Sequence, residues 1–246
     1  MKCLPADLEV IYDQILQRIH GTLIPCVQVL LTWLIFGMHP LTFDELAIVV
    51  TFDATKDTFD ASLALPHPDG IIEVCLSLVT KTGYGTVPLA HSSVKDYFLG
   101  KPRGGQQYII ALCDPCAGHT LITHCCLKYL TQFEWLNKVP DNILWETMES
   151  YVPTHYPLLR YSVNFWPVHY KLSSKNSTLQ VLAMTFFDSE GTVIMKWVQQ
   201  YDDKNQLEHA PLIAYAGFVT TRYGLLHYDY LIRRTGPFIL LSTYLI

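Results

Sequence analysis

Charged side chains are scarce in this chain, and basic ones are the scarcest. Lysine and arginine together number 17 of 246 residues against 22 acidic residues, so the formal net charge is −5 and the pI is near 6.0. Binding to a nucleic-acid backbone depends on clustered Lys and Arg. The composition therefore argues against a nucleic-acid partner. Hydrophobic residues make up 50% of the chain, which is enough for a core of its own.

Two catalytic motifs are absent. No stretch has the G-x-x-x-x-G-K-[ST] spacing of a phosphate-binding loop, because Gly100 and Lys101 are followed by Pro102 and preceded by no matching glycine. The G-x-S-x-G motif of a nucleophilic serine is missing as well. The sequence thus predicts no nucleotide site, no cofactor and no catalytic residue, and we expect that the chain is not an enzyme.

A clear membrane span is lacking too. The uncharged run 21–38 is close to the ~20 apolar residues that a spanning helix needs, but it contains Pro25, Gln28 and Thr32 and stops at His39 and the proline after it. We predict that this run is a buried core helix, and we expect no membrane partner.

The chain has seven cysteines, and an odd number of cysteines cannot all be paired in disulfides within the chain. Lys2, Asp7 and Glu9 interrupt the N-terminus, so we expect no signal peptide. The cysteines are therefore predicted to be reduced thiols of a cytoplasmic protein, mostly small buried groups.

One cysteine-rich stretch, CDPCAGHTLITHCC, suggests a zinc site. Cys113 and Cys116 have metal-ligand spacing. On a helix, however, His119 and Cys126 share a face and His124 points away from it. A tetrahedral site must gather four ligands. We expect no bound metal, and a zinc-containing structural domain stays an alternative.

Helical periodicity is clear at the N-terminus. Apolar residues at i, i+3, i+4 and i+7 predict a helix over 5–19, whose stripe needs a partner that a second helix over 25–36 can supply. The stripe consists of Leu8, Ile11, Tyr12, Ile15, Leu16 and Ile19.

A third helix has a complete start signal. Thr42 is the expected N-cap and Glu45 the N3 residue of a capping box, while Leu41 and Leu46 occupy the two positions of a hydrophobic staple.

Beyond this helix the pattern predicts a short helix over 70–77, then strands over 78–82 and 86–91 joined by a turn. Ser92 or Ser93 is the expected cap of the helix that follows. The predicted fold is mainly α: a winged helix with a small two-stranded β wing, followed by an α-helical region with a possible truncated ankyrin-like start.

The domain organisation follows from these elements. Helices are expected at about 117–133, 141–150 and 157–165, with another pair within 176–201, and HAPLIAYAGF resembles the opening of an ankyrin unit. The predicted divisions are a helical lead-in (1–22), a winged-helix domain (23–102), an α-helical region (103–204) and a degenerate or truncated ankyrin-like tail (205–246).

Six segments, covering roughly residues 3–170, carry a resemblance to a known module. They are LPADLEVIYDQILQRI, LLTWLIFGMHPLTFDELAIVV, IIEVCLSLVT, VPLAHSSVKDYFL, HTLITHCCLKYL and PLLRYSVNFWPVH. In this order they resemble the winged-helix and helical segment that follows the NACHT domain of fungal NOD-like receptor (STAND) NTPases, also named the GPI inositol-deacylase winged helix domain. That second label implies no hydrolase activity. Leu76 departs from the pattern, because a small residue is expected in that turn.

The resemblance implies a non-catalytic regulatory and protein-interaction segment that lacks its nucleotide-binding domain. Its implied partners are a NACHT domain and ankyrin-type repeats, in cis or in trans. His91 stands where such proteins often place a nucleotide-sensing histidine. The residues expected to be structural are Thr42, Glu45, Ser93 and Trp166.

A DNA-binding winged helix is the remaining alternative. From 42 to 100 the basic residues are only Lys56, Lys81 and Lys95, and the expected recognition helix carries Glu73 but no Arg, Lys, Asn or Gln that would read a base edge. Charge therefore argues against this alternative.

Overall fold

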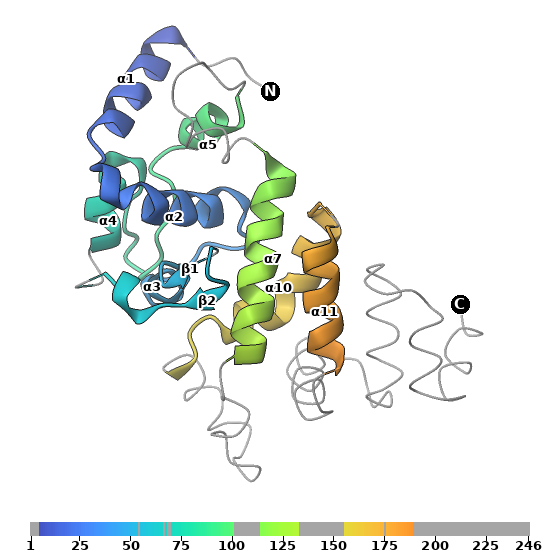
Figure 1. Ribbon diagram of the computed structural model, residues 1–246. Coiled ribbons are helices and arrows are strands. Elements are labelled where there is room, and N and C mark those ends of the chain that lie inside the picture. Colours follow the sequence, from blue (N-terminus) through green and yellow to red (C-terminus); the bar gives the residue numbers. More distant parts are fainter. Residues whose placement is uncertain are drawn as a thin grey trace. The chain divides into compact units, whose positions relative to one another are not determined.

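The computed structural model describes residues 5–53, 55–65, 67, 70–100, 114–132, 155–174 and 176–188. The chain divides into two compact units, 1–122 and 123–246. The helices and strands of the first unit are α1 (Ala6–Gln17), η1 (Gly21–Leu23), α2 (Ile24–Phe36), α3 (Phe43–Val49), β1 (Phe52–Asp53), β2 (Thr58–Phe59), η2 (Ala61–Leu63), α4 (Gly70–Cys75), η3 (Leu76–Leu78) and α5 (Ser92–Leu99) (Figure 1). Helix α7 (Pro115–Gln132) begins in this unit and ends in the second, which also contains α10 (Leu159–Leu172) and α11 (Ser177–Asp188).

Helix α2 is the centre of the first unit. It is apolar nearly all round, as expected of a helix that other elements surround, and Leu30, Trp33 and Ile35 are almost fully buried. α1 and α5 lie on one side of it, and α3 with the small sheet lies on the other (Figure 1). The core-helix prediction for residues 25–36 is therefore confirmed.

No helix among the described residues is both long and apolar enough to cross a membrane. In the part of the chain that the structure describes, one pair of helices, Asp7–Gln17 and Gly21–Phe36, has the combined length and composition of a span, but the pair is bent by 98°.

Helix α3 starts as predicted. The Thr42 hydroxyl accepts a hydrogen bond from the Glu45 N–H at 3.2 Å, and the Glu45 carboxylate accepts one from the Thr42 N–H at 2.8 Å. Leu41 and Leu46 are both buried, consistent with the staple. The capping box is confirmed.

Prolines and several aspartates predict turns over 53–68, but the two-stranded sheet lies largely within this segment. β1 and β2 pair antiparallel, with Phe52 opposite Phe59 and the two rings 5.2 Å apart. Such an aromatic pair directly across two strands stabilises a short ladder. The prediction of a mainly α fold with a small two-stranded sheet is confirmed, but the predicted position of its strands is wrong.

The segment predicted as the wing is a hydrogen-bonded loop instead of two regular strands. Thr80 N–H donates to the Pro88 carbonyl and Ala90 N–H to the Leu78 carbonyl, and Val79 and Leu89 form an isolated antiparallel bridge. Pro88 has no N–H to return a ladder bond, which interrupts the strand.

The helix predicted over 70–77 ends earlier, at Cys75. Leu76, the next residue, has φ +52°. This left-handed conformation costs an L-residue with a Cβ about 1–2 kcal/mol. Of the small residues, only glycine would relieve that strain, because it has no Cβ.

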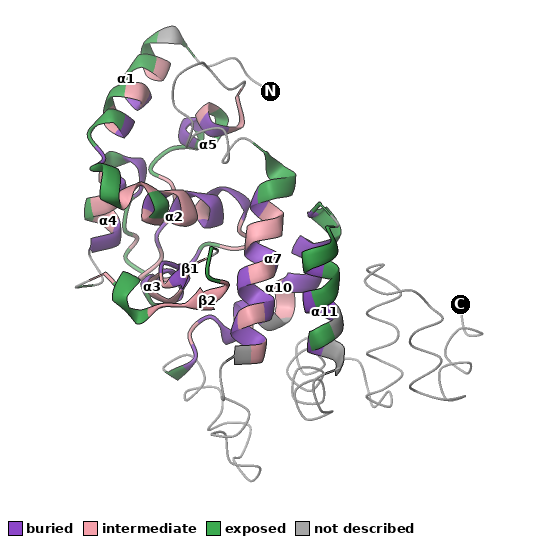
Figure 2. Cartoon of the chain, in the orientation of Figure 1, coloured by how far each residue is buried: buried purple, intermediate pink, exposed green. Residues whose placement is uncertain are grey.

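The second unit has an aromatic core. Trp166 is fully buried on α10, with its ring against Tyr170 of the same helix and Phe186 of α11. The Tyr161 hydroxyl and the buried His169 Nε2 are 2.8 Å apart. Helix α11 has both buried and exposed residues, as expected of a helix with one side packed in the core (Figure 2). This placement agrees with a structural role for Trp166.

The helices expected near 117–133 and 157–165 correspond to α7 and α10, and α11 is the first of the expected pair within 176–201. The expected helix at 141–150, the rest of 176–201 and the ankyrin-like tail 205–246 lie outside the described residues.

Candidate functional site

The N-cap of α5 is His91, not one of the two serines. The backbone of His91 is extended (φ −152°, ψ 153°), and its Nδ1 accepts the N–H of Ser93 at 3.1 Å. The Ser93 Oγ lies 2.7 Å from the same nitrogen. Because Nδ1 accepts, the neutral imidazole carries its proton on Nε2, and the Ser93 hydroxyl donates to Nδ1. His91 itself is exposed to solvent.

Ser93 has a different role from the predicted one. Its side chain is buried, and its Oγ lies 2.6 Å from the hydroxyl of Tyr12 on α1. Since the single hydroxyl proton of Ser93 is directed to His91, Tyr12 is the donor in this pair. Hydrogen bonds therefore run in one direction, from Tyr12 through Ser93 to His91.

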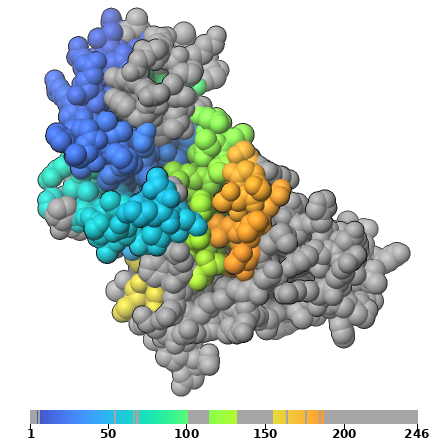
Figure 3. Space-filling view, in the orientation of Figure 1, coloured from blue at the N-terminus to red at the C-terminus, as the bar shows by residue number. Residues whose placement is uncertain are grey.

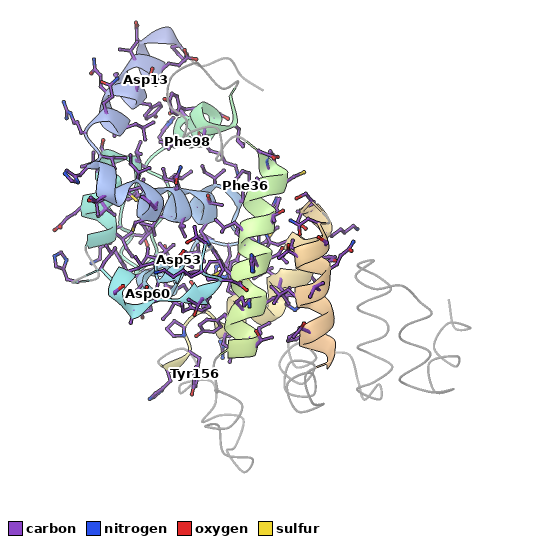
Figure 4. The ribbon with its side chains drawn as sticks, viewed as in Figure 1. Asp13, Phe36, Asp53, Asp60, Phe98 and Tyr156 are labelled. Atoms are coloured by element: carbon purple, nitrogen blue, oxygen red, sulfur yellow. The ribbon has the colours of Figure 1, made fainter. Side chains whose placement is uncertain are left out.

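A second hydrogen bond joins the same two helices. The Tyr97 hydroxyl of α5 donates to Oδ1 of Asp13 on α1 at 2.5 Å, and the rings of Tyr12 and Tyr97 are 5.1 Å apart. Asp13 and the fully buried Phe98 are labelled in Figure 4. We call this set of contacts the α1–α5 junction: Tyr12, Asp13, His91, Ser93 and Tyr97.

Sequence reasoning missed three residues of the junction. Tyr12 was counted only as part of the apolar stripe of α1, and Asp13 and Tyr97 were not singled out. A weak signal exists, because a tyrosine within an apolar stripe brings a hydroxyl that needs a partner when buried.

The apolar stripe of α1 packs only in part. Tyr12 and Leu16 are buried, as is Ile19 just after the helix, but Ile11 is 48% exposed and the adjacent Val10 is 53% exposed. Two neighbouring β-branched side chains therefore face solvent on α1.

Thr42 and Glu45, at the start of α3, are structural residues of a different part of the first unit. We expect Thr42→Ala to lower the free energy of unfolding by about 1 kcal/mol, because the Glu45 N–H loses its acceptor. Thr42→Ser keeps the hydroxyl and should stay near wild type. Urea midpoints measure the difference, and equal losses in both variants would contradict the capping role.

The basic residues of the region 42–100 are mostly engaged with their own chain. Lys56 Nζ lies 3.2 Å from both Asp53 and Asp60, and Lys81 Nζ is 4.7 Å from the centre of the Phe43 ring. The Thr55 hydroxyl and then its N–H bond to Asp53 and lower the pKa of that carboxyl to about 2. Asp53 and Asp60 lie close together in Figure 4, and the segment 52–65 that contains them is at the surface of the first unit in Figure 3. This surface is unsuited to a phosphate backbone.

The expected recognition helix gives the same result. α4 has six residues, and its exposed Glu73 lies 3.9 Å from His67. The helix offers no arginine, lysine, asparagine or glutamine for a base edge.

The cysteine-rich stretch forms most of α7. Cys113 lies outside the described residues, Cys116 is exposed, and the His119 ring packs 5.4 Å from Phe36. Within the described ranges no three His, Cys, Asp or Glu side chains are grouped as metal ligands. Burial raises the pKa of Cys126 to about 12, partly offset by a hydrogen bond to Ser162. This thiol is therefore neutral at pH 7.

Comparison with known proteins gives one similar protein of limited coverage. The azaphilone pigments biosynthesis cluster protein L of Monascus ruber is 28% identical over 216 residues, which is 80% of this chain and 42% of that protein. The chain thus spans less than half the length of this curated relative. No family model matches the chain. No solved structure matches it either.

Proposed function

We propose that this chain is a non-catalytic regulatory arm of a NACHT-type signalling ATPase of the fungal NOD-like receptor class. The arm acts by protein–protein contact, through the exposed part of α1, and its partner is the nucleotide-binding domain. Ankyrin-type repeats are the proposed further partner, and the proposed location is the cytoplasm.

The observation that carries the proposal is the exposure of Val10 and Ile11. A helix whose stripe is only half packed leaves apolar surface for a partner. Asp7 is exposed on the same helix, so a partner surface with basic residues around an apolar centre suits it. The relative's greater length is consistent with a module that works within longer proteins.

His91 completes the proposed arrangement. It is exposed at the start of α5, which is joined to α1 through Ser93 and Tyr12. By the resemblance, its role in the assembled receptor is to sense the bound nucleotide, while the chain alone binds none.

The test is binding in solution. The 246-residue chain is titrated into a purified NACHT domain of this receptor class, loaded with ADP or ATP, and the Kd is measured by calorimetry. Val10→Asp should weaken binding tenfold or more, as for an interface anchor worth about 1.4 kcal/mol. Val181→Asp, at a residue that is 61% exposed on α11, is the matched control and should leave the Kd unchanged.

Two results would contradict the proposal. One is the absence of binding to either loaded form by the folded wild-type chain. The other is an equal loss in both variants, which would show that α1 is not the contact surface.

A further inference from the structure

The α1–α5 junction contains a titratable group in an unusual place. The commonest N-cap residues are Ser, Thr, Asp and Asn, whose acceptor oxygens stay acceptors at neutral pH. Here the acceptor is the Nδ1 of an imidazole. Histidine is the side chain that changes charge between pH 5 and 8, so this cap can be switched off by a proton.

We infer that protonation of His91 removes the N-cap of α5 and loosens its attachment to α1, which makes the α1–α5 junction acid-sensitive. The inference goes beyond the proposed docking and does not depend on it.

The first step concerns the cap itself. A protonated Nδ1 is a donor and accepts neither the Ser93 N–H nor the Ser93 hydroxyl. The N–H of Ser93 then loses its partner, and a positive ring stands at the positive end of a helix, where cations are disfavoured. Both effects act against the folded start of α5.

The second step carries the change to α1. With Nδ1–H as donor, Ser93 Oγ must accept from the ring, and its own proton needs a new acceptor. Ser93 is buried, and the Tyr12 hydroxyl 2.6 Å away already donates to it. One outcome is that the Tyr12 hydroxyl rotates and accepts the Ser93 proton instead of donating its own. Otherwise the buried Ser93 proton has no acceptor, which costs free energy. The hydrogen bond between Tyr97 and Asp13 does not involve the ring and remains.

Other titratable groups lie on the helices of this junction, among them Tyr12 and Asp13 on α1 and Lys95, Asp96 and Tyr97 on α5. The charge of Lys95 also acts on His119 of α7. Burial, and then the charge of Lys95, lower the pKa of His119. As the pH falls, His119 therefore takes up its proton in the unfolded chain at a higher pH than in the folded chain. The free energy of unfolding thus decreases as the pH drops below the ordinary pKa of histidine. A readout local to α5 is needed to separate the two histidines.

The experiment is amide hydrogen exchange of residues 92–97 in the full chain at pH 7.5 and 5.5, corrected for intrinsic rates. In the wild type, protection should fall about fivefold on acidification, equivalent to about 1 kcal/mol at 1.4 kcal/mol per factor of ten. His91→Asn provides a cap that does not titrate and should keep its protection at both values. His91→Ala should be poorly protected at both, and His119→Gln should respond like the wild type.

A second measurement reports the ring directly. Imidazole ¹⁵N shifts at pH 7.5 should show Nδ1 of His91 without a proton and Nε2 with one. The inference is overturned if Nδ1 carries the proton at pH 7.5, if protection in the wild type does not change, or if His91→Asn loses protection to the same extent.

Discussion

Trp166→Ala should lower the free energy of unfolding of the second unit by about 3–5 kcal/mol, the range for removing a large buried aromatic side chain. Trp166 is fully buried, and its ring meets Tyr170 at 6.3 Å and Phe186 at 5.5 Å between ring centres, both edge-on. The substitution removes the contact between α10 and α11 that these rings form. Since domains are stable by only about 5–15 kcal/mol, the loss is a large part of the total.

Chemical denaturation followed by circular dichroism measures this effect. Leu172→Ala, on the same helix but 45% exposed, is the matched control and should change stability by less than about 1 kcal/mol. Trp166→Phe keeps an aromatic ring and should lose less than the alanine variant. Similar midpoints for Trp166→Ala and Leu172→Ala would show that Trp166 is not a core anchor.

Gly118→Ala should destabilise the first unit, although alanine is normally the better helix former. In an exposed helix interior the change from glycine gains up to about 1 kcal/mol. Here a Cβ at Gly118 would lie 2.3 Å from Cδ2 and 2.4 Å from Cε2 of the Phe36 ring. Phe36 is itself buried and packs on His119. Overpacking costs about 1–3 kcal/mol, and this contact is severe, so we expect a net loss of about 2 kcal/mol.

Gly21→Ala is the control for Gly118→Ala. No atom lies within 4 Å of a Cβ at Gly21, and its φ is not in the left-handed region. Its stability should be unchanged or slightly higher, because alanine restricts the unfolded chain. Phe36→Leu combined with Gly118→Ala should recover part of the loss by making room. Higher stability of Gly118→Ala than of the wild type would contradict the close packing.

The features that the sequence predicts well are local. The capping box depends on residues three apart, Thr42 and Glu45, and the staple on Leu41 and Leu46, so one segment contains all the information. The N-cap of α5 is equally local, but the general preference for serine and threonine at this position predicted Ser92 or Ser93 as the cap. The structure shows that the preceding histidine supplies the acceptor.

The features that the sequence does not predict are those that join distant segments. Helical spacing identifies the apolar side of α1 but not the partner of each residue: Tyr12 and Leu16 are buried, whereas Ile11 is 48% exposed. The contact of Phe36 with Gly118 has no local pattern at all. The aspartates in the segment 53–68 favour turns and therefore argued against strands. The aromatic residues Phe52 and Phe59, which lie opposite each other in the sheet, were the signal in favour of strands.

The α1–α5 junction also has a consequence for synthesis on the ribosome. Its two tyrosine hydrogen bonds join residues 81 and 84 positions apart in the sequence. At about 5–20 residues per second, α1 is made roughly 4–17 s before the segment that completes it. During that interval the apolar side of α1 has no α5 to cover it and is open to association with other nascent chains. A chain interrupted before Tyr97 lacks these contacts, so its α1 keeps an uncovered apolar side.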